Sequence, residues 1–424
     1  MKTSPQQVNV KTEIVAGITT FFTMSYIVIV NPAILATEGT GLTFSGVMTA
    51  TVLVCFLMTL LMGLYARLPF AVAPGMGINA FFTFTIILGE QVPWPTALGA
   101  VFWSGVLFLV ISATPLREMI ARAIPLGLRS AIAAGIGIFL TFIGLKSCGF
   151  IVADPVTLVR PGELDAKILV AVLGALVMIW LLRRKNPLAF LAGMVLVTAV
   201  ALVCGWIPRP ASLVAAPDFQ SVFFKLDIWG ALKISLLPAV FSLMFTDLFD
   251  SISTFIGVSQ ACDILDETGQ PRNLREGLIV DAFATLGAGL CGTSSGTTYI
   301  ESSAGIEAGG RTGLTSVVTA LCFLPCLFLA PVAAAVPAIA TAPVLVLVGA
   351  LMFRSITKVP LHSLEDALPA FLTMVLIPLT FSITQGILWG FLSHTALYIA
   401  GGRRRELPVT MYFLAALAAV LLLI

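Results

Sequence analysis

The sequence has 424 residues, of which 58% are hydrophobic and only 10% are charged, and its mean hydropathy is +1.05. Soluble domains carry about 25% charged residues, so this composition excludes an ordinary soluble enzyme and indicates a chain embedded in a lipid bilayer. The formal net charge of +2 arises from basic residues scattered along the chain rather than gathered in a patch, which argues against nucleic-acid binding.

Apolar runs divide the chain into about fourteen predicted membrane spans, because each spanning helix needs roughly 20 apolar residues. The first seven lie at about 14–35, 43–65, 69–88, 95–114, 129–144, 167–184 and 186–206. After a polar, proline-containing stretch come seven more, at about 234–258, 277–292, 296–308, 313–336, 341–357, 366–382 and 384–400. A last apolar stretch at 408–424 is interpreted either as a further span or as a helix on the bilayer surface.

The basic residues predict the orientation of these spans. Most of the 23 Lys and Arg residues fall on the N-terminal tail and on the even-numbered loops, including Arg183, Arg184 and Lys185. Cytoplasmic loops keep the excess of positive charge, so we expect a multi-pass protein of the cytoplasmic (inner) membrane with its N-terminus in the cytoplasm. The first apolar run is long enough to span, and we expect it to serve as its own insertion signal rather than a cleaved one.

Two of the predicted spans are interrupted by glycine and small polar residues. They are the third, at Ala73–Asn79, and the tenth, at Gly292–Tyr299, which hold equivalent places in the two sets of seven. Because seven is odd, a second half that repeats the first enters the membrane inverted, and matched broken spans in such repeats mark a substrate site at the midplane. The alternative is that these glycines only allow close helix packing.

Ionisable groups inside membrane spans are costly and are candidates for function, and four acidic residues of the predicted spans are the leading candidates here. Asp247 and Asp250 are three residues apart in the eighth span and therefore share a helix face, Asp281 lies in the ninth span, and Glu301 follows the broken tenth segment. Burial disfavours the charged form of a carboxyl, so each of them could bind and release a coupling proton. The alternative is that these carboxyls are protonated and only hydrogen-bond neighbouring helices. For Asp281 a further alternative is that it only lies at the membrane interface.

Several motifs resemble those of a known family. They are Thr12–Ile27, Ala73–Phe82, Asp247-Leu248-Phe249-Asp250 and Gly296–Ser302, and they resemble the AzgA-like purine permeases, the hypoxanthine, guanine and adenine branch of the nucleobase/ascorbate transporters. The resemblance implies fourteen spans in two inverted repeats, with short strands in spans 3 and 10 that flank the substrate. It also implies a core domain of spans 1–4 and 8–11 and a gate domain of the other spans.

The same resemblance implies which residues bind the substrate. Asn79, Asp247 and Glu301 match the branch's substrate-site residues, and the residues beside them in the two broken spans complete the predicted site: Ala80, Phe81, Thr297, Thr298 and Tyr299. Where this branch usually has a glycine, three residues after the second aspartate of the motif, this chain has Ser253. We expect that serine to add bulk near the site and to influence which purine is preferred.

The prediction is therefore a secondary transporter that imports purine bases, hypoxanthine or guanine first and adenine second, by proton symport with alternating access. The expected domains are a core of residues 1–128 and 234–340 and a gate of residues 129–233 and 341–424. The ligands are a purine base, a proton and the bilayer, with no cofactor and no metal; whether the chain forms a homodimer is left open. The alternatives are an inverted-repeat carrier of an inorganic anion or of another nucleobase, and a membrane enzyme or channel. Enzyme motifs such as Walker A and HExxH are absent from the sequence.

Overall fold

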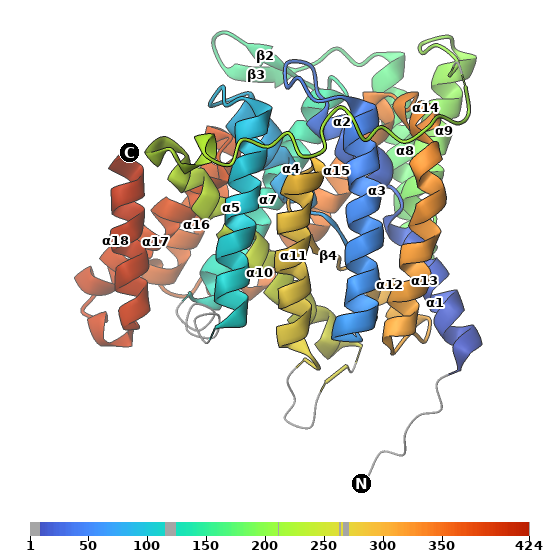
Figure 1. The fold of residues 1–424 in the computed structure, drawn as a ribbon. Helices are drawn as coiled ribbons and strands as arrows, with labels where there is room; N and C mark the ends of the chain where they lie inside the picture. Colours follow the sequence, from blue (N-terminus) through green and yellow to red (C-terminus); the bar gives the residue numbers. More distant parts are fainter. Residues whose placement is uncertain (1–8, 115–123, 211, 263, 266–270, 424) are drawn as a thin grey trace.

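The computed structural model describes residues 9–114, 124–210, 212–262, 264–265 and 271–423, and these residues are mostly helical (Figure 1). The first part of the chain contains α1 (Val10–Met24), α2 (Ile27–Leu35), α3 (Phe44–Leu61) with its π-helical continuation η1 (Met62–Ala66), β1 (Val72–Pro74), α4 (Met76–Ala80) with its continuation η2 (Phe81–Ile87), α5 (Trp94–Ala113), α7 (Leu126–Ser147), β2 (Ile151–Asp154), β3 (Leu158–Pro161), α8 (Ala166–Arg183) and α9 (Ala189–Val203).

The second part begins after a long extended segment. It contains η3 (Gly230–Leu232), η4 (Ile234–Leu236), α10 (Leu237–Ala261), α11 (Leu274–Cys291), β4 (Gly296–Thr298), α12 (Ser302–Glu307), α13 (Gly313–Phe323), η5 (Leu324–Phe328), α14 (Ala330–Ala334), α15 (Ala338–Phe353), η6 (Arg354–Lys358), α16 (Leu364–Thr380), α17 (Ile383–Ala400), η7 (Arg404–Glu406) and α18 (Val409–Leu423). Each predicted span coincides with one or more of these helices, and the stretch predicted at 408–424 is the helix α18.

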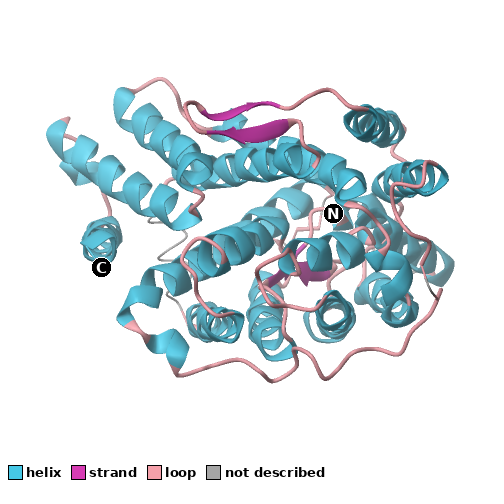
Figure 2. Cartoon of the chain, turned by 90° about the horizontal axis from the view of Figure 1, so that it is seen from above, coloured by secondary structure: helices cyan, strands magenta, loops and turns pink. Residues whose placement is uncertain are grey.

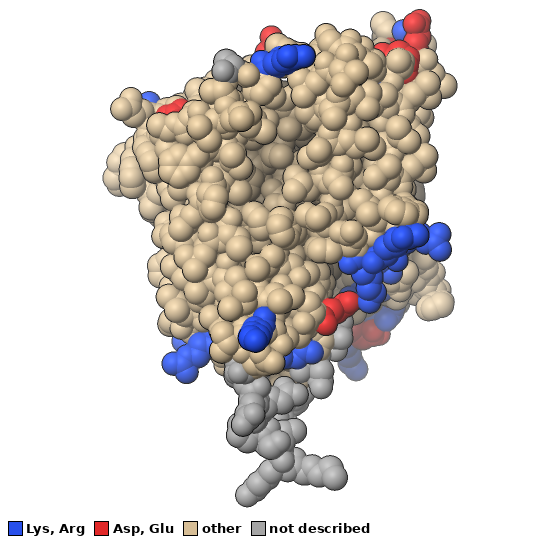
Figure 3. Space-filling model, turned by 90° about the vertical axis from the view of Figure 1, so that its right-hand side faces the viewer, with Lys and Arg blue, Asp and Glu red and all other residues tan. Residues whose placement is uncertain are grey.

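The helices have the length and composition of a membrane protein. Within the described residues, seven are long and apolar enough to cross a bilayer: Val10–Leu35, Phe44–Ala66, Trp94–Ala113, Leu126–Ser147, Ala166–Arg183, Ile234–Ser259 and Ala338–Lys358. Shorter apolar helices, including α9 and α18, stand beside them. On the face shown in Figure 3, Lys, Arg, Asp and Glu gather toward the two ends, and a broad band without charge lies between them. This distribution is that of a multi-pass protein whose middle faces lipid.

The two glycine-interrupted segments meet as a short antiparallel ribbon enclosed by helices (Figure 2). β1 pairs with β4 in the register Val72 to Thr298, Ala73 to Thr297 and Pro74 to Gly296, and all six of these residues are buried. The strands that the family resemblance implied are therefore observed. A two-stranded ribbon has two free edges whose backbone groups need partners in a bilayer, and this requirement shapes the site described below.

A second pair of strands was not anticipated from the sequence. β2 and β3 form an antiparallel hairpin between α7 and α8, at the edge of the view in Figure 2. The carboxylate of Asp154 accepts hydrogen bonds from the backbone N–H groups of Thr157 and Val156, which hold the turn and lower the pKa of Asp154. An Asp-Pro turn between runs rich in β-branched residues is a local signal for such a hairpin, but the search for apolar runs of spanning length does not detect it.

The segment between α9 and α10 runs as a strap over the helix ends at the top of Figure 1. Its backbone N–H groups at Ala215, Phe224 and Asp227 donate to carbonyl oxygens of η5, α11 and the start of α5. The strap therefore ties together the ends of helices that come from both parts of the chain.

Candidate functional site

The free edge of β1 is satisfied by one side chain of α3. The Thr59 hydroxyl donates to the carbonyl of Val72 at 3.1 Å and accepts from the N–H of the same residue at 2.9 Å. Thr59 is fully buried. A threonine hydroxyl on a neighbouring helix thus supplies the hydrogen bonds that a third strand would supply in a larger sheet.

The free edge of β4 is satisfied in the same manner by α11. Asp281 accepts from the hydroxyl of Thr298 at 2.7 Å and from its backbone N–H at 3.3 Å. One turn further along α11, the hydroxyl of Thr285 lies 3.1 Å from the carbonyl oxygen of Gly296. Spacing of four residues places Asp281 and Thr285 on one face of the helix, and that face lies along the strand.

Behind this edge lies a buried polar layer that includes Asp247. The hydroxyl of Thr285 is also hydrogen-bonded to Asp247 Oδ2, while Oδ1 of Asp247 is buried without a hydrogen-bond partner among the described residues. The hydroxyls of Ser251 and Thr297 lie 3.0 Å apart. Among the ion pairs found in the described part of the chain, none includes Asp247 or Asp281. The two carboxyls therefore lie in the interior with hydroxyl partners and without a neighbouring cation.

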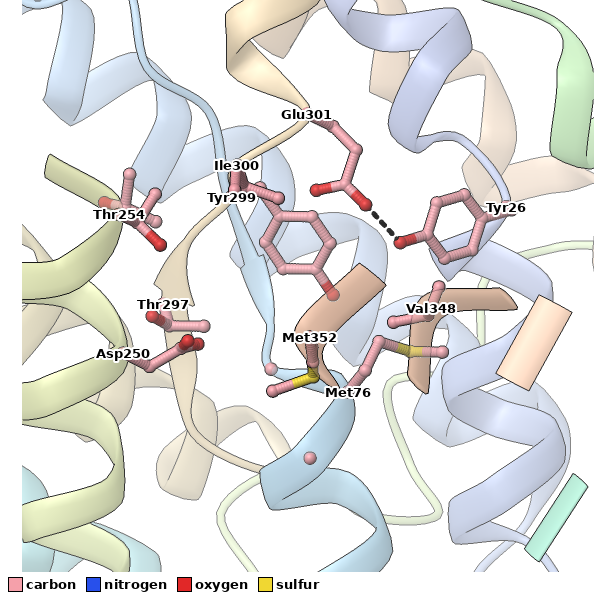
Figure 4. Close-up of a pocket in the computed structure, with 13 residues that line it drawn as sticks. Tyr26, Met76, Asp250, Thr254, Thr297, Tyr299, Ile300, Glu301, Val348 and Met352 are labelled. Carbon is pink, nitrogen blue, oxygen red and sulfur yellow. Dashed lines mark hydrogen bonds between the residues drawn. The ribbon is translucent and has the colours of Figure 1, made fainter. Parts of the chain in front are cut away.

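Beside the ribbon is a cavity of about 70 Å³ (Figure 4). By the usual criterion a cavity of this size holds several water molecules. Its walls come from the break between α1 and α2, the residues that join each strand to the following helix, one face of α10, and α15. The lining residues are Tyr26, Gly75, Met76, Gly77, Asp250, Thr254, Thr297, Thr298, Tyr299, Ile300, Glu301, Val348 and Met352.

The carboxylate of Glu301 is held by a tyrosine. The hydroxyl of Tyr26 donates to Glu301 Oε1 at 2.6 Å, and Figure 4 shows the two side chains meeting over the cavity. Tyr26 is 1% exposed, and its ring packs against Phe190 of α9 with ring centroids 4.8 Å apart. The hydroxyl of Tyr299 has a different partner and donates to the carbonyl of Pro74 at 2.5 Å. Of the two tyrosines, Tyr26 holds the acid and Tyr299 holds the strands together.

The cavity combines a carboxylate with apolar walls. Met76 lies on one side, and Val348 and Met352 of α15 approach from another helix (Figure 4). Asp250 and Thr297 lie together on the side opposite Tyr26. Such a site suits a small flat ligand that has N–H donors along its edge and apolar faces, because carboxylates accept hydrogen bonds and methionine side chains adapt to flat surfaces.

Two glycines are required where backbone approaches other groups closely. A Cβ atom on Gly77 would lie 2.3 Å from Cγ2 of Ile136 in α7, and one on Gly75 would lie 2.9 Å from Cγ2 of Thr297. Neither distance is tolerated by real side chains. The broken third segment therefore contacts both β4 and α7 through positions where only glycine fits.

The structure brings some of the predicted site residues to the cavity and leaves others behind it. Glu301, Thr297, Thr298, Tyr299 and Asp250 line it. The other predicted residues are fully buried and do not line it: Asn79, Ala80, Phe81, Asp247 and Asp281. The hydroxyl of Ser294 donates to Asn79 Oδ1, so the side chain of Asn79 joins the two broken segments. The expected bulk of Ser253 is not found near the cavity, because Ser253 is exposed and is not among the lining residues.

Sequence reasoning missed several residues. Tyr26 lies in the motif Thr12–Ile27, but nothing in that motif relates its hydroxyl to an acid 275 positions away. Thr59 is one of several hydroxyl residues in α3, and Thr285 is an isolated hydroxyl in α11, so neither carries a local signal. Val348 and Met352 lie in an apolar run in which every residue looks equally suited to face lipid.

Comparison with known proteins now decides the family. Residues 11–388 match the model Xan_ur_permease, described as a permease family. The chain belongs to this permease family. Over 408 residues it is 40% identical to the adenine permease AdeP of Escherichia coli, and over 418 residues it is 38% identical to the guanine/hypoxanthine permease PbuO of Bacillus subtilis. These matches cover 96% of this chain in each case, and 91% and 96% of the two relatives. The resemblance to purine permeases is confirmed, and the chain is a membrane transporter rather than an enzyme.

A solved structure supports the fold independently. The transmembrane domain of the cyanobacterial bicarbonate transporter BicA superposes with a TM-score of 0.67, covering 91% of this permease and 98% of that domain, at 18% sequence identity. At this identity the likeness concerns the fold alone. It places the permease in the same architecture as an anion transporter, so substrate class has to be argued from the site.

Proposed function

We propose that this permease imports purine nucleobases by proton symport. The observation that carries the proposal is the cavity beside the β1–β4 ribbon, in which Glu301 presents a carboxylate between apolar walls. Support for the purine class comes from the adenine permease AdeP and the guanine/hypoxanthine permease PbuO, which the chain matches over nearly its whole length. The anion carrier, which the fold alone would allow, fits the cavity poorly, because Glu301 and Asp250 line it and none of its lining residues is basic.

In this proposal Glu301 is the main acceptor for the base. A carboxylate has two oxygens, and Tyr26 occupies Oε1, so Oε2 can accept an N–H group from the edge of a purine. Tyr26 acts as a positioning residue that holds the carboxylate in this orientation. The apolar side chains of Met76, Val348 and Met352 would cover the flat faces of the base. Asn79 would act from behind the cavity by fixing the broken third segment to Ser294.

The buried layer behind β4 suggests how a proton is coupled to the site. A hydroxyl has a single hydrogen, and that of Thr285 faces two acceptors, Asp247 Oδ2 and the carbonyl of Gly296. When Asp247 is protonated it can donate to Thr285, which is then free to donate to Gly296. When Asp247 is ionised, Thr285 donates to Asp247 and the carbonyl loses its donor. The protonation of Asp247 would thereby change the support of a strand that lines the cavity.

Asp250 and Asp281 extend this layer toward the ligand. Asp250 lines the cavity itself, and Asp281 holds Thr298 on β4. Uncompensated carboxylates in a protein interior are costly, so uptake of a proton with the substrate would remove charge before the site crosses the membrane. We assign Asp247 the coupling role and regard Asp250, Asp281 and Glu301 as the groups that share it.

The proposed architecture has fourteen spans in two inverted repeats. Thr59 on the helix before β1 supports Val72, the first residue of β1, and Thr285 on the helix before β4 lies within hydrogen-bond distance of the carbonyl of Gly296, the first residue of β4. Equivalent helices thus support equivalent strand positions, as expected for a repeat. Residues 1–128 and 234–340 would form the core domain and 129–233 and 341–424 the gate. Since α7 begins at Leu126 and α15 at Ala338, two of these boundaries fit better at the starts of these helices.

We expect inward transport, because protons enter the cytoplasm down the membrane potential; the chain is predicted to lie in the inner membrane with its N-terminus in the cytoplasm. A proton that enters gains about 2.3 kcal/mol per 100 mV of membrane potential. Each 1.4 kcal/mol corresponds to a tenfold change in concentration ratio. One proton for each base therefore supports more than tenfold accumulation before any pH gradient is added.

The test is uptake of labelled hypoxanthine, guanine, adenine, uracil and bicarbonate into proteoliposomes with an imposed proton gradient. Accumulation of a purine, competed by other purines and abolished by a protonophore, is the expected result. Uptake of bicarbonate or uracil in preference to every purine would overturn the substrate class. Accumulation that persists with the protonophore, or that requires sodium, would overturn proton coupling while leaving the substrate class intact.

A further inference from the structure

A second and larger cavity lies outside the substrate site. Its volume is about 410 Å³, and it lies between the α1–α2 pair, α9 and the segment from η5 to α14. Its lining residues are Phe21, Ser25, Val28, Ile29, Met48, Leu191, Met194, Val195, Thr198, Ala199, Leu202, Cys326, Leu329, Val332, Ala333 and Val336. None of them lines the cavity at Glu301.

The walls of this cavity offer almost nothing to a polar ligand. Of the residues that line it, only Ser25 and Thr198 carry a hydroxyl, and both hydroxyls already donate within their own helices. Ser25 donates to the carbonyl of Phe22 at 3.1 Å, and Thr198 donates to that of Met194 at 2.8 Å. Buried water needs two to four polar partners. Water is therefore a poor occupant despite the size of the space.

The cavity is continuous with the apolar outer surface. Val195, Leu329 and Val332 are 59%, 40% and 39% exposed, whereas Met48 and Met194 are each 1% exposed. The lining thus runs from side chains that face the bilayer to side chains that lie in the interior. An empty space of this size forfeits the dispersion contacts that packed atoms make, and the molecules available at its mouth are lipids.

We propose that this cavity binds an acyl chain of a membrane phospholipid. The chain enters beside Val195 and Val332 and extends inward toward Met48 and Met194. It lies between α9 on one side and α1, α2 and α14 on the other. A flexible apolar chain matches walls made of branched aliphatic and methionine side chains. This site does not depend on which solute the permease carries.

Two alanines of α14 provide a matched pair of variants. Ala333 is 4% exposed and lines the cavity, whereas its neighbour Ala334 is exposed and does not. Ala333→Phe fills the space with a side chain, and Ala334→Phe adds the same volume outside it. Each variant is reconstituted in phosphatidylethanolamine/phosphatidylglycerol nanodiscs, and the phospholipid retained after gentle release is counted by native mass spectrometry. We expect wild type and Ala334→Phe to retain one molecule more than Ala333→Phe, with all three showing the same melting temperature.

Cross-linking locates the chain even if Ala333→Phe does not fold. Wild-type protein is reconstituted with a phospholipid that carries a diazirine near the end of one acyl chain, and the linked residues are identified after illumination. Links to the interior residues Met48 or Met194 support the proposal, because lipid that only surrounds the protein cannot reach them. Links confined to exposed residues such as Val195, or equal lipid retention by both variants, would overturn it.

Discussion

The hydrogen bond between Tyr26 and Glu301 makes a quantitative prediction about base binding. Tyr26→Phe keeps the ring and its packing on Phe190 but removes the donor that lies 2.6 Å from Glu301 Oε1. Hydrogen bonds to charged groups contribute about 1.5–3 kcal/mol. Because water in the cavity can replace the lost donor in part, we expect the lower end of this range, which is about a tenfold loss in affinity. Isothermal titration calorimetry with the transported purine measures it.

A double-mutant cycle shows whether Tyr26 acts through Glu301. Glu301→Gln removes the charged acceptor itself and should weaken binding by about 10- to 150-fold. In the Glu301→Gln background, Tyr26→Phe should change affinity by no more than about twofold, because its partner is already gone. Tyr299→Phe is the comparison variant: Tyr299 lines the same cavity but donates to the carbonyl of Pro74, so any loss of affinity that it causes should be equal in the wild-type and Glu301→Gln backgrounds. Wild-type affinity in Tyr26→Phe, or an undiminished effect of it in Glu301→Gln, would refute the positioning role.

Three further predictions concern the residues around the cavity. Asp247→Asn should bind the base in detergent yet fail to accumulate it in proteoliposomes, and gradient-driven accumulation by this variant would remove Asp247 from the coupling role. Thr285→Val leaves the carbonyl of Gly296 without its hydroxyl partner, so it should lower the free energy of unfolding by about 1–3 kcal/mol. It should also flatten the pH dependence of uptake. Thr285→Ser keeps a hydroxyl and should show the wild-type stability and pH dependence. Gly77→Ala should abolish uptake, because the added methyl group overpacks against Ile136 and costs about 1–3 kcal/mol of stability. If that contact is the cause, the double variant with Ile136→Ala should recover uptake.

Much of the architecture could be predicted because the bilayer imposes simple rules on a sequence. The length of apolar runs located the helices, and the glycine-rich segments at Ala73–Asn79 and Gly292–Tyr299 marked where helical structure stops. The carboxyls of Asp247 and Glu301 were noticeable because ionisable residues are rare in such runs. These signals are local, since each can be read within about 20 residues of chain.

The arrangement of the site could not be predicted because it depends on contacts between distant segments. Asp247 looked like a ligand for the substrate, yet in the structure it lies behind β4 and contacts Thr285 instead. Tyr26 looked like any aromatic residue of a first span, and only the folded chain brings its hydroxyl to Glu301. The β2–β3 hairpin, by contrast, had a local signal in Asp154 and the following proline, and a search for strands outside the membrane would have found it.

In the mechanism we propose, the ribbon relates the cavity at Glu301 to the buried carboxyls of Asp247 and Asp281. Strands of three residues cannot satisfy their own edges, and lipid offers no hydrogen bonds, so side chains from α3 and α11 have to do so. On the β1 edge the hydrogen bonds come from Thr59, which does not titrate. On the β4 edge they come from Asp281 and from Thr285, and Thr285 is also hydrogen-bonded to Asp247. The backbone that shapes the cavity is therefore supported on one edge by groups whose hydrogen bonds depend on a proton. In the mechanism we propose, the carrier therefore needs no separate device to relate proton binding to the shape of the cavity.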